Sequence, residues 1–305
     1  MSNRLVLATV FLVAILIGAN FTMLKFALDH TTPMLLASIR TVVGGTFLIG
    51  FALLRGERLP RRFDDLRNIF VISLSITTVS STLLVFGVNR VPAGVTSLMS
   101  STMPLFTAVL SALLLGAAVS RVAGIGLGIG LAGTVILASP SLSGDTVAIG
   151  IISLAVSALA WAFGTVYMKW RDFGRVSPVM LVGVQLAMSA VVLVPFALIV
   201  EGTAETEWTV GLLGPVLYAA IPANAVTFAL MATIVSRATP TQASATAYLI
   251  PVFGVFFGWL IRDEVLGAAE VIGGALVVTG VYVLVTSNAR RVEKARPSAA
   301  SVDTA

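Results

Sequence analysis

The sequence predicts an all-α membrane protein of ten transmembrane helices, arranged as two inverted repeats of five helices each. The first observation is composition, since hydrophobic residues make up 57% of the chain and charged residues only 11%. A soluble domain carries about 25% charged residues. The second is that the charges cluster and leave apolar stretches of about 20 residues, the length that crosses a hydrocarbon core. The third is an internal duplication.

The duplication is clearest in two stretches of fifteen residues. Arg90 to Pro104 reads RVPAGVTSLMSSTMP, and Arg237 to Pro251 reads RATPTQASATAYLIP. Both open with Arg, carry a Pro near the start and a Ser seven residues after the Arg, and close with Pro, at a spacing of 147 residues. The same spacing relates two further glycine pairs, Gly126 with Gly273 and Gly133 with Gly280. A long chain with such an internal match is first interpreted as a repeat protein.

Hydropathy selects ten spans, which must be helices because lipid offers no hydrogen-bond partners to a free backbone. Two repeats of five spans, at residues 1–140 and 141–288, run in opposite directions because five is odd, and 289–305 is predicted to be a disordered basic cytoplasmic tail. Inverted repeats are typical of transporters, with the substrate site near the bilayer midplane at the repeat interface. The predicted spans are 5–28, 33–54, 67–88, 92–115, 121–138, 146–169, 178–200, 210–233, 240–261 and 266–287.

Orientation follows from Lys and Arg, which are enriched in cytoplasmic loops. The connectors at 55–67 and 169–175 and the tail at 290–296 are basic, and with ten spans they all fall on one side. The opposite side carries DHTT, SPSLSGD and the acidic EGTAETEW. We therefore expect both termini in the cytoplasm and a multi-pass protein of the inner (plasma) membrane. The net charge of +5 lies in these connectors, so it indicates orientation and no nucleic-acid partner.

Several motifs at these places carry a family resemblance. They are Gly18-Ala19-Asn20-Phe21 with Lys25, Pro33 and Arg40, then ALAWAFGTVYMKW in span six, and the close of the second repeat from Pro251 through Asp263-Glu264. Together with the spans and the duplication, the chain resembles the EamA branch of the drug/metabolite transporter superfamily from about residue 5 to 287. The resemblance implies a central cavity enclosed by spans one to four and six to nine, and export of amino acids or related small metabolites.

The chain departs from the family pattern at the end of span four. Family members often end both the fourth and the ninth span with Gly-Glu. Here the second copy has Asp263-Glu264, whereas the first has Gly116-Ala117. Whatever the acidic residue does, only one half of this chain can do it.

Pro104 and Pro251 lie in the middle of spans four and nine and are the candidate gating residues. Each removes a backbone donor and crowds the carbonyl four residues earlier, which predicts a kink in each helix. A kinked helix suits a gate; the alternative is a static kink that helps packing.

Polar residues within the spans are the candidate substrate ligands. Ser97 and Ser101 share a helix face with Pro104, and Ser244 and Tyr248 match them in the second copy. The alternative for such hydroxyls is bonding to their own helix or close helix packing. An Arg at mid-membrane costs about 2.5–3.5 kcal/mol, so Arg40 should face a partner, water or the interface. The candidate set is Asn20, Arg40, Thr78, Thr82, Ser97, Ser101, Phe163, Gln185, Asn224, Ser244 and Tyr248.

Other classes of function fit the composition poorly. There is no Cys and one His, and no Asp or Glu lies near the middle of a span, which disfavours an intramembrane enzyme, a metal site and a proton-coupled pump. We expect no cofactor, a small-molecule substrate, and a monomer or homodimer in the bilayer that works by alternating access. Facilitated diffusion or exchange fits the sequence at least as well as proton coupling, for which Asp263 or Glu264 at the mouth of the cavity is the candidate carrier. A receptor is a further alternative, but it has no reason to keep two antiparallel copies. Efflux of amphipathic toxic compounds remains the alternative within transport.

Overall fold

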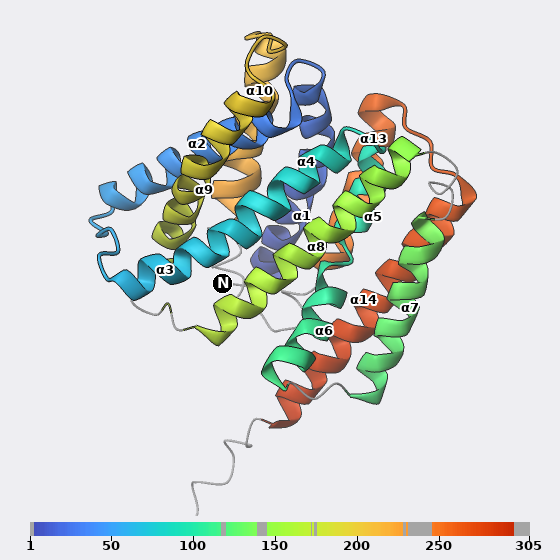
Figure 1. The fold of residues 1–305 in the computed structure, drawn as a ribbon. Coiled ribbons are helices and arrows are strands. Elements are labelled where there is room, and N and C mark those ends of the chain that lie inside the picture. Colours follow the sequence, from blue (N-terminus) through green and yellow to red (C-terminus); the bar gives the residue numbers. More distant parts are fainter. Residues whose placement is uncertain are drawn as a thin grey trace, which may run out of the picture.

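The chain forms a bundle of helices in the computed structural model (Figure 1). The structure describes residues 3–116, 120–138, 145–171, 173, 176–227, 230 and 246–295, and no strand occurs in these ranges. The helices are α1 (Asn3–Leu28), α2 (Pro33–Leu54), α3 (Phe63–Ile72), η1 (Ser73–Ser81), α4 (Thr82–Val88), α5 (Ala93–Ser100), α6 (Met103–Leu115), α7 (Arg121–Ala138), α8 (Asp145–Trp170), α9 (Pro178–Val200), α10 (Val210–Ala220), η3 (Ile221–Val226), α13 (Thr246–Arg262) and α14 (Ala268–Ala295).

Six helical segments in the described part of the chain are long and apolar enough to cross a membrane. They lie at 8–28, 33–54, 63–88, 93–115, 146–168 and 178–200. Shorter apolar helices, of 10–17 residues, lie at 121–136, 210–226, 249–262 and 268–283. The prediction of an all-helical chain with membrane-crossing segments is confirmed for the described residues. The count of ten and the inverted arrangement stay predictions.

Local sequence explains where the helices begin. Pro33 stands in the first turn of α2, where its missing N–H costs nothing and its fixed φ suits the helix. At the start of α9, the hydroxyl of Ser177 accepts a hydrogen bond from the Met180 N–H at 3.1 Å, a side-chain N-cap.

Three predicted spans are not continuous α-helices in the part of the chain that the structure describes. In span eight, α10 passes into the π-helix η3 at Ile221–Val226. Span three contains the π-helix η1 at Ser73–Ser81, between α3 and α4. Span four consists of α5 and α6, which are separated at Ser101 and Thr102. Pro104 therefore lies in the first turn of α6, the position that tolerates proline. The expected kink is a break between two helices.

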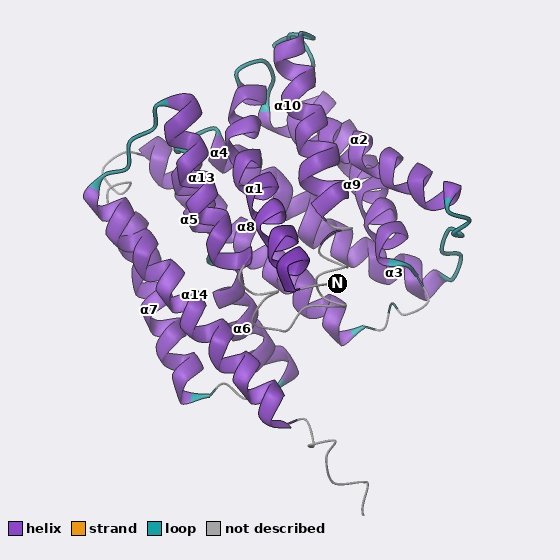
Figure 2. Ribbon diagram, turned by 180° about the vertical axis from the view of Figure 1, so that it is seen from behind, coloured by secondary structure: helices purple, strands orange, loops and turns teal. Residues whose placement is uncertain are grey.

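Glycines set the closest helix contacts. α7 packs along α14 at one side of the molecule, and α2 packs along α9 at the other, as Figures 1 and 2 both show. A Cβ on Gly133 would lie 2.7 Å from the backbone nitrogen of Val277, and one on Gly45 would lie 3.1 Å from that of Ala187. Since lipid provides no hydrophobic force between helices, small residues that let backbones approach strengthen their association.

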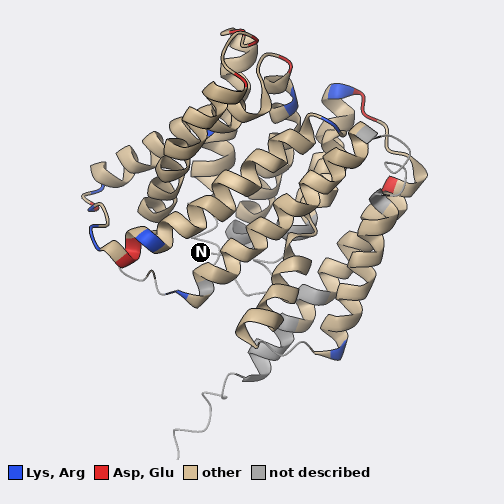
Figure 3. Ribbon diagram, in the orientation of Figure 1, with Lys and Arg blue, Asp and Glu red and all other residues tan. Residues whose placement is uncertain are grey.

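Charged residues gather at the two ends of the helices, and the middle of the bundle is almost free of them (Figure 3). One end carries Lys25, Glu201, Arg262 and Glu264, and the other carries the Arg55–Arg67 connector. We call the first the Lys25 end. This separation is the pattern of a chain whose middle lies in hydrocarbon.

Candidate functional site

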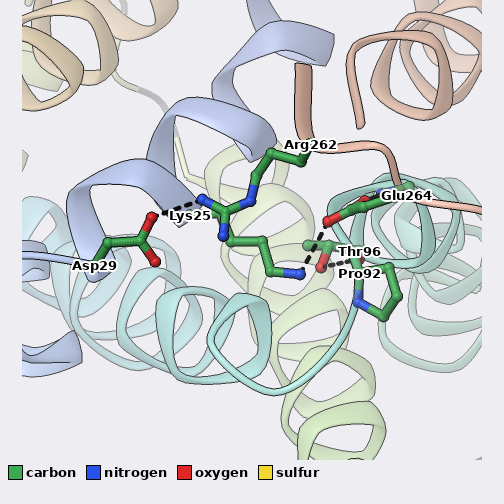
Figure 4. A network of polar contacts seen from close by, with 7 residues as sticks. Lys25, Asp29, Pro92, Thr96, Arg262 and Glu264 are labelled. Atoms are coloured by element: carbon green, nitrogen blue, oxygen red, sulfur yellow. Dashed lines mark hydrogen bonds and ion pairs between the residues drawn. The ribbon is translucent and has the colours of Figure 1, made fainter. Parts of the chain in front are cut away.

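A polar cluster at the Lys25 end joins three helices (Figure 4). Lys25, near the end of α1, donates from Nζ to Oε1 of Glu264 at 2.9 Å. The other carboxylate oxygen, Oε2, accepts the backbone N–H of Gly94 in the first turn of α5 at 3.2 Å. Glu264 follows α13, so a single carboxylate connects α1, α5 and α13.

The turn after α13 directs Glu264 inward. Asp263 has a φ of 52°, in the left-handed region, and the N–H of Glu264 bonds to the carbonyl of Gly258 at 3.2 Å. The N–H of Asp263 bonds to the carbonyl of Trp259 at 3.1 Å, so this is a helix C-terminus of the αL type, where glycine is usual because a side chain there costs about 1 kcal/mol or more. Gly258 leaves the room that the carboxylate occupies, since a Cβ there would lie 2.6 Å from Oε2 of Glu264.

The surroundings of Glu264 favour its charged form. Burial by itself raises the pKa of this carboxyl, but hydrogen bonds from the Ala93 and Gly94 amides and from Lys25 lower it more, so its net pKa lies below the ordinary value. A second ion pair, Arg262 to Asp29 at 2.7 Å, lies beside it and is more exposed. The carboxylate of Glu264 is therefore ionised at neutral pH.

Below this cluster, α13 packs tightly against both α1 and α5. A Cβ on Gly18 would lie 2.6 Å from that of Phe253, and a Cβ on Gly254 would collide with the side chain of Ser97. The Ser97 hydroxyl is fully buried and donates to the carbonyl of Gly94 at 2.7 Å, with a longer contact of 3.5 Å to that of Pro251. The two proline-bearing stretches of the duplication thus meet directly, and Ser97 lies in their contact.

Two predicted ligands deeper in the bundle have unpaired atoms. Arg40 in α2 is 6% exposed and Asn20 in α1 is 7% exposed. Nε and Nη1 of Arg40 and Oδ1 of Asn20 are buried without a hydrogen-bond partner in the described part of the chain. Because buried polar atoms are normally paired, each is a place where a ligand or water can bind.

Other predicted ligands bond to a neighbouring helix or to their own helix instead. Thr78 in η1 bonds to Ser189 in α9 at 3.0 Å, and Gln185 donates to Thr77 at 2.7 Å. Ser101 donates to the carbonyl of Ser97 one turn earlier, at 3.0 Å. The contacts of Thr78 and Ser101 are the two alternatives, helix packing and bonding to the own helix, that the sequence left open for hydroxyl side chains.

The remaining predicted residues lie apart from these groups. Phe163 is 41% exposed and lines an apolar hollow between η1, α6 and α8. Thr82 has a buried hydroxyl with no partner among the described residues, and Asn224 lies in the π-helix η3. Ser244 and the side chain of Tyr248 lie outside the described residues.

Sequence reasoning missed two features of this region. Thr22 in α1 is fully buried, and its hydroxyl has no partner within the described ranges. The Lys25–Glu264 pair joins residues 239 positions apart, which no local pattern reveals. The sequence indicated only that Lys25 and Glu264 both belong to motifs of the family resemblance and that each lies near the end of a span.

Comparison with known proteins decides the family. The sequence profile of the EamA-like transporter family matches residues 4–139 and, a second time, residues 148–286. The chain belongs to the EamA-like transporter family. The resemblance deduced from the motifs is thereby confirmed.

Relatives of this EamA-like chain cover nearly its whole length. The uncharacterized transporter YvbV of Bacillus subtilis (strain 168) is 30% identical over 287 residues, 94% of this chain and 93% of YvbV. The uncharacterized inner membrane transporter YedA of Escherichia coli (strain K12) is 29% identical over 282 residues, 90% of this chain and 89% of YedA. A solved crystal structure at 21% identity has a TM-score of 0.64 and covers 92% of this chain and 98% of its own, which shows a shared fold.

Membership in this family also settles the broad class of activity. An EamA-like protein is a transporter, so the expectation that the chain is a membrane transporter rather than an enzyme is confirmed.

Proposed function

We propose that this EamA-like transporter exports amino acids or related small metabolites across the inner membrane by alternating access between two inverted five-helix repeats around a central cavity. The two separate family matches, at 4–139 and 148–286, support the duplication. The inner-membrane location rests on the name of YedA and on the charge pattern of the connectors. Both termini are then cytoplasmic, and the Lys25 end faces outward.

Helix packing supports the inverted repeat. Equivalent spans of the two halves pack on each other in three pairs: span two on span seven (α2 with α9), span four on span nine (α5 with α13), and span five on span ten (α7 with α14). The first helices of the two halves, α1 and α8, make matching contacts. Helix α1 packs on α13 and α10, which belong to spans nine and eight, and α8 packs on α6 and η1, which belong to spans four and three. Gly116 ends α6 and Asp263 follows α13, 147 positions later, and both have left-handed backbones. A pseudo-two-fold axis relating the halves produces this reciprocity.

The observation that carries the substrate assignment is the buried guanidinium of Arg40, whose Nε and Nη1 have no partner among the described residues. Arginine stays protonated in proteins, and its planar donors match a carboxylate. Arg40 lies seven residues into α2 and Asn20 eight residues before the end of α1, about 11 and 12 Å from the same end at 1.5 Å per residue. An amino acid suits this pair of residues, with its carboxylate accepting from Arg40 and its amino group donating to Oδ1 of Asn20.

The absence of a mid-span carboxylate favours transport along a gradient. Every Asp and Glu of the sequence lies at a span end or in a connector. A buried carboxylate is the usual proton carrier of coupled pumps. We therefore propose facilitated diffusion or exchange, with the break between α5 and α6 beside Pro104 and the proline inside α13, Pro251, as the places where the helices bend.

A second candidate function is efflux of amphipathic compounds. The hollow beside Phe163 has a volume of about 550 Å³ and is lined almost entirely by apolar side chains. Several of these, including Val79 and Val156, are more than 40% exposed. An apolar molecule dissolved in the bilayer would fit this surface better than the buried Arg40 region.

Transport in proteoliposomes separates the two candidates. We expect at least one labelled amino acid to equilibrate faster than through empty vesicles, while its decarboxylated amine does not. Arg40→Gln should abolish that flux, and Arg40→Lys should raise KM because a point charge replaces the bidentate donors. Arg67→Gln is the matched control, since Arg67 is about half exposed and its ion pair within the described ranges is with the exposed Asp64. Flux of hydrophobic dyes alone, unaffected by Arg40→Gln, would replace the leading proposal with the second.

A further inference from the structure

The Lys25–Glu264 cluster connects the two halves of the chain. Lys25 and Gly94 belong to the first family match and Glu264 to the second. In the proposed function, opening the Lys25 end requires the helices of one repeat to separate from those of the other. Both hydrogen bonds of the Glu264 carboxylate would then have to break.

The geometry of the cluster suits a contact that is either made or broken. The two oxygens of Glu264 are used separately, Oε1 by Lys25 at 2.9 Å and Oε2 by the Gly94 amide at 3.2 Å. The side chains of Lys25 and Glu264 are 21% and 11% exposed, so water screens them only partly. The left-handed Asp263 and the space at Gly258 hold the carboxylate in place. A small relative movement of α1 or α5 breaks these charge-assisted bonds.

The first repeat lacks the acidic residue that would make the corresponding contact. The position 147 residues before Glu264 is Ala117, which has no carboxylate. Under the inverted repeat, this counterpart lies at the opposite end of the molecule. The contact between Lys25 and Glu264 therefore acts at one end only, and it favours the state in which the Lys25 end is closed.

We propose that Lys25 and Glu264 form a one-sided latch that holds the Lys25 end of the transport pathway shut and sets the resting state to face the other end. This rests on the proposed alternating access. The pair positions helices and does not bind the substrate. Breaking it shifts the population toward the state that is open at the Lys25 end, with no need for a substrate to be present.

Cysteine accessibility tests the latch directly, because the natural chain has no Cys. Ser97→Cys places one thiol in the buried α5–α13 contact below the latch. Its labelling by a membrane-impermeant thiol reagent is measured from each side of the membrane at pH 7.5. We expect Glu264→Gln and Lys25→Gln each to raise the labelling rate from the Lys25 end about tenfold, as loss of one charge-assisted bond implies. Lys25→Arg should stay within about twofold of the parent, because it keeps the pair.

Asp29→Asn is the matched control. Asp29 also connects α1 to the end of α13, through Arg262, but its side chain is 49% exposed and the pair is worth little. An increase for Asp29→Asn equal to that for Glu264→Gln, equal increases from both sides of the membrane, or no increase at all would overturn the latch. Failure of both Lys25→Gln and Glu264→Gln to fold would assign the pair a purely structural role. Labelling needs no substrate, so these outcomes are independent of whether amino acids are transported.

Discussion

Gly133→Ala tests how closely α7 and α14 approach. The new Cβ would lie 2.7 Å from the backbone nitrogen of Val277 and 2.8 Å from the carbonyl oxygen of Gly273, whereas ordinary contacts begin at 3.4 Å. Because these are backbone atoms, no side-chain rotation relieves the overlap, and α14 must move by several tenths of an ångström. Overpacking of this kind costs about 1–3 kcal/mol.

Gly128→Ala on the same helix is the control, since a Cβ at Gly128 meets nothing within 4 Å. Both substitutions gain about 1 kcal/mol of helix propensity, so the difference between them isolates the packing. A difference of about 2 kcal/mol corresponds to about 4–8 °C in the melting temperature. The assay is thermal unfolding of the purified protein in detergent, followed by size-exclusion chromatography. Equal melting temperatures for the two variants would refute the close approach of α7 and α14.

Two further predictions concern the Lys25 end. Because the pKa of Glu264 is lowered by its partners, its stabilising contribution is fully present above the ordinary glutamate value of 4.5 and is lost as the pH falls through the lower folded value. The melting temperature of the wild type should exceed that of Glu264→Gln by a constant amount between pH 5.5 and 7.5 and converge below about pH 4.5; a constant difference down to pH 3 would contradict this. Glu201→Gln should lower stability by about 1 kcal/mol, measured by thermal unfolding, because Glu201 accepts the first-turn N–H groups of Met34 and Leu35 at 2.9 and 3.1 Å. An unchanged melting temperature would show that this cap contributes nothing.

The boundaries of the helices followed from local sequence wherever proline or charge marks them. α2 and α9 begin at Pro33 and Pro178, and α7 covers the predicted residues 121–138. The π-helix η1 was not predictable, because its hydroxyls bond to α8 and α9 rather than within their own turn. Hydropathy predicts only the apolar length of such a span, and tertiary contacts determine whether a part of it forms an α-helix or a π-helix.

The candidate site was predicted less completely than the fold, for a physical reason. Residue type shows which side chains are polar but not whether a neighbouring helix will pair them. Gln185 and Arg40 are equally unusual in an apolar span, yet Gln185 bonds to Thr77 and two nitrogens of Arg40 lack a partner among the described residues. Only packing separates a polar residue that holds helices together from one that is left for a ligand.

Thr22 extends this distinction to a residue that the sequence did not select. Its hydroxyl is fully buried and unpaired in the described part of the chain, whereas that of Thr77 accepts a bond from Gln185. An unpaired buried hydroxyl costs about 1–3 kcal/mol, so Thr22→Val should raise the melting temperature, and Thr77→Val should lower it by leaving the amide unpaired. Thermal unfolding checks both, and a decrease for Thr22→Val as large as that for Thr77→Val would show that Thr22 is already bonded. If Thr22→Val is more stable but transports more slowly, the unpaired hydroxyl serves the substrate, because functional sites retain groups that cost stability.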